Sequence, residues 1–106
     1  MIGASLPELR FAAEARADLL DIYRRGLRTR SPEQALLFAE SIERRCEVFL
    51  TNPALGVALP ESSSMRAFAF DRLITVVFEA DASVVTILRL IPRGADLNAL
   101  VRGLRS

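Results

Sequence analysis

The sequence predicts a two-layer α+β domain in which an antiparallel helical hairpin covers one face of a sheet that contains an antiparallel meander. Apolar residues first recur at helical spacing over two stretches, at about 13–28 and 32–51, and from residue 65 onward they alternate with polar residues. The connections between the helices and between the later strands are short, which favours antiparallel neighbours. We therefore expect the order β-α-α-β-β-β, with a short C-terminal tail, in a single domain spanning residues 1–106.

A short strand and an amphipathic helix are expected first. Leu9 and Phe11 alternate with Arg10 and Ala12, as strand residues do. The helix that follows carries one apolar stripe, formed by Ala15, Leu19, Ile22, Tyr23 and Leu27. Tyr23 is the only tyrosine, and its place on this stripe indicates packing rather than reaction.

The second helix has a well-marked start. Ser31 is a favourable N-cap, Pro32 suits the first helical position, and Gln34 completes a capping box. The apolar stripe continues up to an Asn-Pro pair at 52–53. Because the residue before a proline is biased away from helical geometry, the helix is predicted to end near Thr51.

The last third of the chain is expected to form a three-stranded antiparallel meander. Residues 52–64 are rich in turn-forming types and are expected to form a long surface loop. Arg66 shares a face with Phe68 and Phe70, and Pro92 ends the last strand. The expected strands cover residues 65–70, 73–79 and 84–91.

The composition excludes several kinds of site. The chain has no histidine and a single cysteine, so an intramolecular disulfide and a zinc site built from His and Cys are excluded. All 14 basic residues are arginine, and a guanidinium stays protonated near pH 7. We expect no cofactor and no metal. Cys46 lies on the second helical stripe, which predicts a small buried hydrophobe rather than a reactive thiol.

No targeting or membrane segment is expected. The N-terminal residues lack a basic region followed by an apolar stretch. The uninterrupted apolar runs are far shorter than the ~20 residues that a bilayer-spanning helix needs. The sequence therefore predicts a cytoplasmic protein without membrane contact.

Several local motifs occur in a recognisable order. Residues 17–23 (Ala-Asp-Leu-Leu-Asp-Ile-Tyr) lie in the first helix, residues 52–56 (Asn-Pro-Ala-Leu-Gly) leave the second, and Arg66 precedes Phe68 in an R-x-F strand. With the order of elements, these motifs resemble the RelE/ParE superfamily of bacterial toxin–antitoxin pairs, closest to its ParE branch. The resemblance covers about residues 9–100.

The C-terminal motif matches this family in part. Arg89 followed by Asp96 and Leu97 corresponds to the family's ending, which usually has the pattern I-x-R-x-x-H-x-x-R-D-L. Pro92 stands where the family usually has histidine, and Gly94-Ala95 replaces the residues before the aspartate. Target contacts that relatives make through this stretch would depend here on Arg93.

The resemblance implies a toxin of a type II toxin–antitoxin system. Members of the ParE branch inhibit DNA gyrase by binding it without catalysis, and a cognate antitoxin that folds on binding neutralises them. Direct nucleic-acid binding by this chain is not expected. The alternative from another class is a RelE-like, ribosome-dependent mRNA endonuclease. A third reading is a degenerate member that has lost toxicity and only binds the antitoxin.

The sequence offers few residues that could act as the acid and base of a nuclease. Cleaving RNA through its 2′-hydroxyl requires a base, an acid and stabilisation of charge at the phosphate. Histidine and lysine are absent, and arginine does not exchange protons near pH 7. The carboxylates of Asp71, Glu79 and Asp81 lie in turns or at a strand end, with no pairing visible in the sequence.

Basic residues near the C-terminus are the main candidates for contact with a partner. Residues 85–106 hold four arginines and one acid, which is either a solvated tail or a binding end. Arg66 and Arg89 fall on strands, where they either reach water or Glu79, or form a basic surface. If they bind, replacing Arg89 or Arg93 by Ala should weaken toxicity more than folding. The candidate residues for binding the target or the antitoxin are Arg66, Arg89, Arg93, Asp96 and Leu97.

Overall fold

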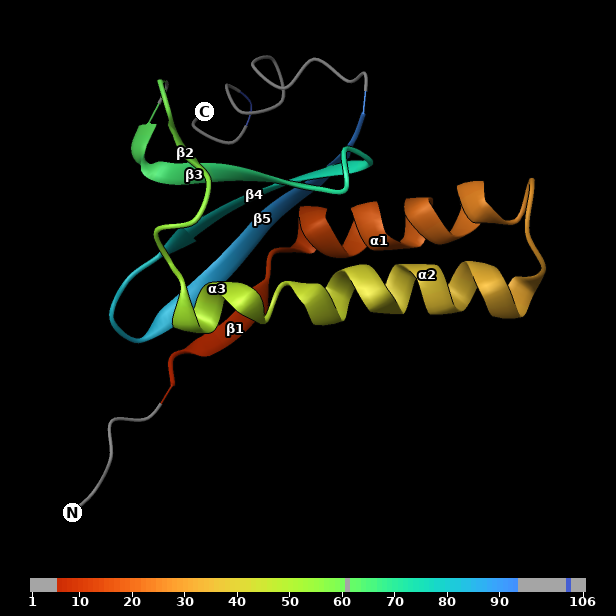
Figure 1. Cartoon of the computed structure of the whole chain (residues 1–106), viewed down its shortest axis with the longest axis horizontal. Helices are drawn as coiled ribbons and strands as arrows, with labels where there is room; N and C mark the ends of the chain where they lie inside the picture. Colours follow the sequence, from red (N-terminus) through yellow and green to blue (C-terminus); the bar gives the residue numbers. More distant parts are fainter. Residues whose placement is uncertain (1–5, 61, 94–102, 104–106) are drawn as a thin grey trace.

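The protein is an α+β domain built on a mixed five-stranded sheet, as Figure 1 shows. The computed structural model describes residues 6–60, 62–93 and 103. An antiparallel hairpin of two long helices runs beside the sheet and extends past it (Figure 1). This confirms the predicted fold class and the order of its elements. The elements are β1 (Glu8–Phe11), α1 (Ala13–Gly26), α2 (Pro32–Arg45), α3 (Val48–Thr51), β2 (Val57–Leu59), β3 (Ser62–Phe70), β4 (Ile74–Ala80) and β5 (Val84–Pro92).

The strands are arranged in the order β1-β5-β4-β3-β2. The four later strands form an antiparallel meander, because short turns connect them. The Asp71-Arg72 turn has φ values of 52° and 62°, as tight hairpin turns require. β1 is different, since it pairs in parallel with β5, from Glu8 opposite Val84 to Phe11 opposite Ile87. Among the described strands, the first is thus joined to the last.

The helical hairpin begins as the sequence predicts. The Gln34 amide donates to Ser31 Oγ at 3.2 Å, and the Ser31 amide donates to Gln34 Oε1 at 3.2 Å, so the capping box is confirmed. The two helices approach closely at their loop end. A Cβ atom on Gly26 would lie only 3.0 Å from the Cβ of Ala35, so a larger residue there would require the two helices to shift slightly apart.

The second helix is shorter than its apolar stripe predicts. α2 ends at Arg45, and a separate turn, α3, covers Val48–Thr51. Between them the backbone tightens, since the amides of Cys46 and Glu47 donate to carbonyls three residues earlier. The prediction of one continuous helix was therefore wrong. The tightened turn directs Phe49 into the centre of the core.

The predicted loop at residues 52–64 was also wrong in part, because it contains β2 and the start of β3. β2 pairs with β3, with Val57 opposite Ala67. The strand is short and follows Gly56, which hides it in the sequence. Gly56 has φ +81°, and a Cβ atom there would lie 2.2 Å from the carbonyl oxygen of Ala67. This close approach of two backbones requires glycine.

The main core lies between the helices and one face of the sheet. Phe49 is fully buried, with its ring centroid 4.0 Å from that of Phe78 and 5.9 Å from that of Phe70. Phe68 lies edge-on to Phe49, also at 5.9 Å. A second cluster lies on the other face, as the alternation along β3 and β4 requires. It contains Leu59, Met65, Val77 and Ile91.

Candidate functional site

Arg66 lies on β3 and binds the chain segment that leads into β2. Its Nε donates to the carbonyl of Leu55 at 2.9 Å, and its Nη2 donates to those of Ala54 and Gly56, both at 2.8 Å. One guanidinium therefore satisfies three successive carbonyls and fixes the Asn-Pro-Ala-Leu-Gly segment against the sheet. That Arg66 also contacts a partner stays a prediction.

Arg89 lies on β5 and forms an ion pair with Asp18 of α1. Its Nε is 2.8 Å from Asp18 Oδ2 and its Nη2 is 3.0 Å from Oδ1, a bidentate geometry. The side chains are only 21% and 16% exposed. The hydrogen bonds that Arg89 donates to Asp18 raise the pKa of Arg89 above its usual value. The alternative that a strand arginine pairs with Glu79 was wrong, since Glu79 accepts instead from the Ser64 hydroxyl at 3.3 Å.

The same carboxylate also fixes an irregular point in the sheet. The register between β4 and β5 shifts between Val77 and Phe78, so β5 contains an extra residue there, a β-bulge. Asp18 Oδ2 accepts the amide of Leu90 at 2.8 Å, next to this bulge. Sequence reasoning singled out Arg89 but missed its partner, although Asp18 belongs to the helical motif that carried the family resemblance.

The other candidate residues follow β5. Arg93 is exposed, and its amide donates to the carbonyl of Leu73 at 2.9 Å. Asp96 and Leu97 lie outside the described residues. Arg66 and Arg89 are not brought together, because β4 separates their strands and each side chain has its own partners.

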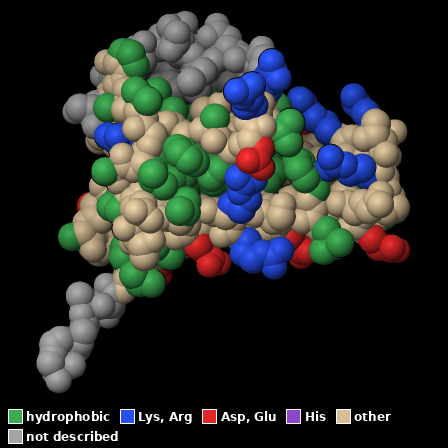
Figure 2. Space-filling model, viewed as in Figure 1, with side chains coloured by type: hydrophobic (Ala, Val, Ile, Leu, Met, Phe, Trp, Pro, Cys, Tyr) green, Lys and Arg blue, Asp and Glu red, His purple; other side chains and the backbone are tan. Residues whose placement is uncertain are grey.

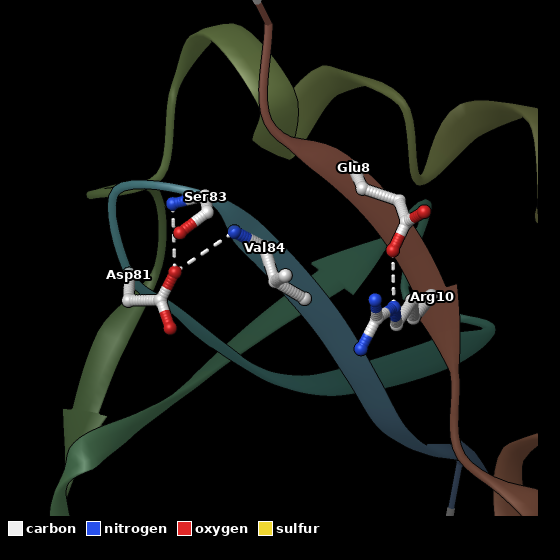
Figure 3. Close-up of polar contacts among 5 residues, drawn as sticks. All are labelled: Glu8, Arg10, Asp81, Ser83 and Val84. Carbon is white, nitrogen blue, oxygen red and sulfur yellow. Dashed lines mark hydrogen bonds and ion pairs between the residues drawn. The ribbon is translucent and has the colours of Figure 1, made fainter.

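The carboxylates that a nuclease would need have structural partners. Asp81 Oδ1 accepts the amides of Ser83 at 2.7 Å and Val84 at 2.8 Å, forming the turn before β5 (Figure 3). These backbone hydrogen bonds lower the pKa of Asp81. Figure 3 also shows Arg10 paired with Glu8 on β1.

Asp71 and Cys46 also have structural roles within the fold. Asp71 Oδ2 lies 2.7 Å from Nη1 of Arg45. Burial raises the pKa of the Cys46 thiol to about 12, so it stays protonated and is a poor nucleophile. This confirms the expectation that Cys46 is a buried core residue.

An apolar groove runs between α1 and α2 on the side of Leu20 and Leu36. These two leucines are 48% and 50% exposed, although each is large and apolar. The Arg16–Glu43 ion pair, at 3.0 Å, crosses from one helix to the other beside them. We call this the hairpin groove. It has a volume of about 430 Å³ and is lined by Arg16, Leu19, Leu20, Tyr23, Leu36, Ala39, Glu40 and Glu43.

The hairpin groove has the character of a protein-binding surface. Contiguous exposed apolar side chains with a charged border are typical of such sites, and a groove between two helices suits the apolar face of a third. The sequence contained a signal for it, because Leu20 and Leu36 lie beside the apolar stripes rather than on them. Sequence reasoning did not use that signal.

Comparison with known proteins places the chain in a family. Residues 9–97 match the model of the family described as the ParE toxin of the type II toxin–antitoxin system parDE. The chain belongs to the ParE toxin family. It is therefore a ParE-type toxin of a type II toxin–antitoxin system, as the motifs indicated. The matched region includes all five residues predicted to bind a partner.

The fold of this ParE-family chain also matches a solved structure. That structure is the "Chromosomal ParDE TA system from P. aeruginosa", with a TM-score of 0.72 and 23% sequence identity. The match covers 83% of this chain and 97% of that one. At this identity it shows the shared fold. No curated protein sequence matches the chain. Among the described residues, no helix is long and apolar enough to cross a membrane.

Proposed function

We propose that this ParE-family toxin inhibits DNA gyrase by binding it, without catalysis, and that a cognate antitoxin neutralises it. The observation that carries the proposal is the hairpin groove, where half-exposed Leu20 and Leu36 offer an apolar surface to a protein. Since gyrase acts on bacterial DNA inside the cell, the proposed activity is cytoplasmic.

The hairpin groove suits the antitoxin in particular. An amphipathic helix that folds on binding would bury its apolar face between α1 and α2. Glu40 on one border, beside the Arg16–Glu43 ion pair, would pair with a basic residue of that helix. Coupled folding of this kind covers a large surface and produces a stable complex.

The described side chains support binding over RNA cleavage. Asp71, Glu79 and Asp81 each have a hydrogen-bond or ion-pair partner within the fold. They lie at different turns and strand ends, and no histidine is available to share a proton with them.

The five candidate residues take different proposed roles. Arg66 and Arg89 are proposed to position the loop before β2 and the end of β5, because their guanidinium groups are bonded within the fold. Arg93 is exposed and is proposed to contact the target. Asp96 and Leu97, which follow it in the sequence, are proposed to extend that contact.

The decisive experiment compares gyrase inhibition with RNA cleavage. The chain is produced with the antitoxin encoded beside it, separated from it and refolded, and then added to a gyrase supercoiling assay and to translating ribosomes. Inhibited supercoiling with intact mRNA would support the proposal. Cleaved mRNA with unaffected gyrase would establish the endonuclease alternative, and normal growth on induction would indicate the degenerate, antitoxin-binding form.

A further inference from the structure

Five arginines lie along the loop end of the helical hairpin and the adjacent end of the sheet. We call this surface the basic end, and it contains Arg25, Arg28, Arg30, Arg72 and Arg93. We propose that the basic end is the surface through which the chain docks onto an acidic protein surface of its gyrase target. The inference rests on the proposed function, because it assigns a surface to that target.

The basic end is assembled from three separate parts of the chain. A groove of about 250 Å³ is lined by Arg25 and Arg30 of the hairpin, Leu73 of the β3–β4 turn and Pro92 of β5. Arg93 is tied to this turn, since its amide donates to the Leu73 carbonyl at 2.9 Å. Figure 2 shows basic side chains gathered over the hairpin loop and the neighbouring tip of the sheet.

Nearby acids neutralise this surface only in part. Asp21 pairs with Arg25 at 2.8 Å, and Asp71 is directed toward Arg45 at 2.7 Å. Among the described residues, no ion pair joins an acid to Arg28, Arg72 or Arg93. The charges of these three arginines are therefore available to an acidic partner, and they would speed the encounter by electrostatic steering.

The floor of the groove favours a protein over a nucleic acid. Leu73 is 50% exposed, and the groove is otherwise floored by Ile22, Phe38, Ile74 and Pro92. The Arg30 guanidinium lies over the Phe38 ring, 4.3 Å from its centroid, so this ring is not an open platform for stacking bases. A recessed apolar floor with a basic rim matches one bulky side chain among acidic residues.

The basic end is separate from the hairpin groove. No residue that lines the hairpin groove also lines the groove at the basic end. A variant of the basic end should therefore keep its antitoxin, which supplies an independent check that the variant is folded.

The test compares a variant that lacks two charges of the basic end with a control variant that lacks two charges elsewhere. Arg28→Gln with Arg72→Asn is the test variant, because asparagine tolerates the positive φ of residue 72. Arg10→Gln with Arg44→Gln, on β1 and at the far end of α2 from the hairpin loop, is the matched control (Figure 1). Arg28→Lys with Arg72→Lys keeps the charge. Each is assayed for supercoiling inhibition at low and high salt and for co-purification with the antitoxin.

We expect the test variant to need about tenfold more protein for the same inhibition, and its inhibition to depend less on salt. The control and the lysine variant should inhibit as the parent chain does, and all should retain the antitoxin. Equal inhibition by the test and control variants would overturn the inference while leaving the proposed function intact.

Two other outcomes would also overturn it. If the parent chain alone binds duplex DNA in a mobility-shift assay and the test variant does not, the basic end is a nucleic-acid-binding surface. If the parent chain does not inhibit gyrase at all, the proposed function fails and the inference fails with it.

Discussion

Asp18 and Arg89, 71 positions apart, form a bidentate ion pair that joins α1 to β5. The carboxylate also accepts the Leu90 amide, so a single side chain satisfies a guanidinium and a backbone group beside a β-bulge. This arrangement changes the expectation for Arg89. From the sequence its loss should weaken toxicity more than folding, whereas the structure predicts that folding is affected first.

Replacing Asp18 by Ala should lower the free energy of unfolding by about 2–4 kcal/mol, since it leaves a largely buried guanidinium and the Leu90 amide without a partner. Urea denaturation measures the loss. Asp21→Ala is the matched control, because its pair with Arg25 is more than half exposed and should contribute less than about 1 kcal/mol. Equal losses in the two variants would show that the Asp18 pair has no special structural role.

Replacing Arg66 by Lys should loosen the segment before β2 although the charge is kept. An ammonium group cannot reproduce the planar fork that reaches the carbonyls of Leu55 and Gly56. We expect faster amide hydrogen exchange in Val57–Leu59 and little change in β4. Unchanged exchange in β2 would contradict the anchoring role.

Replacing Phe49 by Ala should destabilise the protein by about 3–5 kcal/mol, because it removes the ring around which the core aromatics pack. Phe49→Leu retains most of the volume and should cost clearly less. Thermal and urea unfolding of the two variants give the comparison. Similar small losses would mean that the core collapses around the missing ring.

Replacing Arg93 by Ala should weaken growth arrest without a measurable change in melting temperature. The side chain is exposed, and exposed positions rarely alter stability by more than about 0.5 kcal/mol. Arg44→Ala, also exposed and away from the basic end, controls for the loss of one charge. Full toxicity of the Arg93 variant would remove this residue from the proposed contact.

The Asp81 turn should make stability depend on acid pH. Its backbone hydrogen bonds lower the pKa in the folded state, so the ionised carboxylate stabilises the fold above the unfolded pKa of about 3.9. This contribution is lost as the pH falls through the lowered folded value. Asp81→Asn should therefore be less stable than the parent at neutral pH, with a difference that shrinks in acid. A constant difference across this range would exclude the carboxylate's charge as the cause.

Local patterns predicted much of the fold. The Ser31–Gln34 capping box and the Asp71-Arg72 turn depend on neighbouring residues, so the sequence contains their whole cause. β2 escaped notice because its formation depends on Arg66 and on the backbone contact at Gly56, both of which need β3 to be in place.

The candidate site was harder to predict than the fold. Arg66 and Arg89 stood out as charges on apolar strands, but only their tertiary partners define their surroundings. The basic end could not be found from the sequence, since its residues are far apart along the chain. Only the fold places Leu73 of the β3–β4 turn beside Arg30 of the hairpin loop and bonds Arg93 to Leu73.

The parallel pairing of β1 with β5 has a consequence for how the chain acquires its structure during synthesis. β1 precedes every other described strand and has the last of them, β5, as its neighbour in the sheet, so β1 can pair only after β5 has been synthesised. Contacts between such distant segments slow folding. A nascent toxin should therefore keep an incomplete sheet until β5 has emerged, which leaves an interval in which a partner already present in the cell can meet it first.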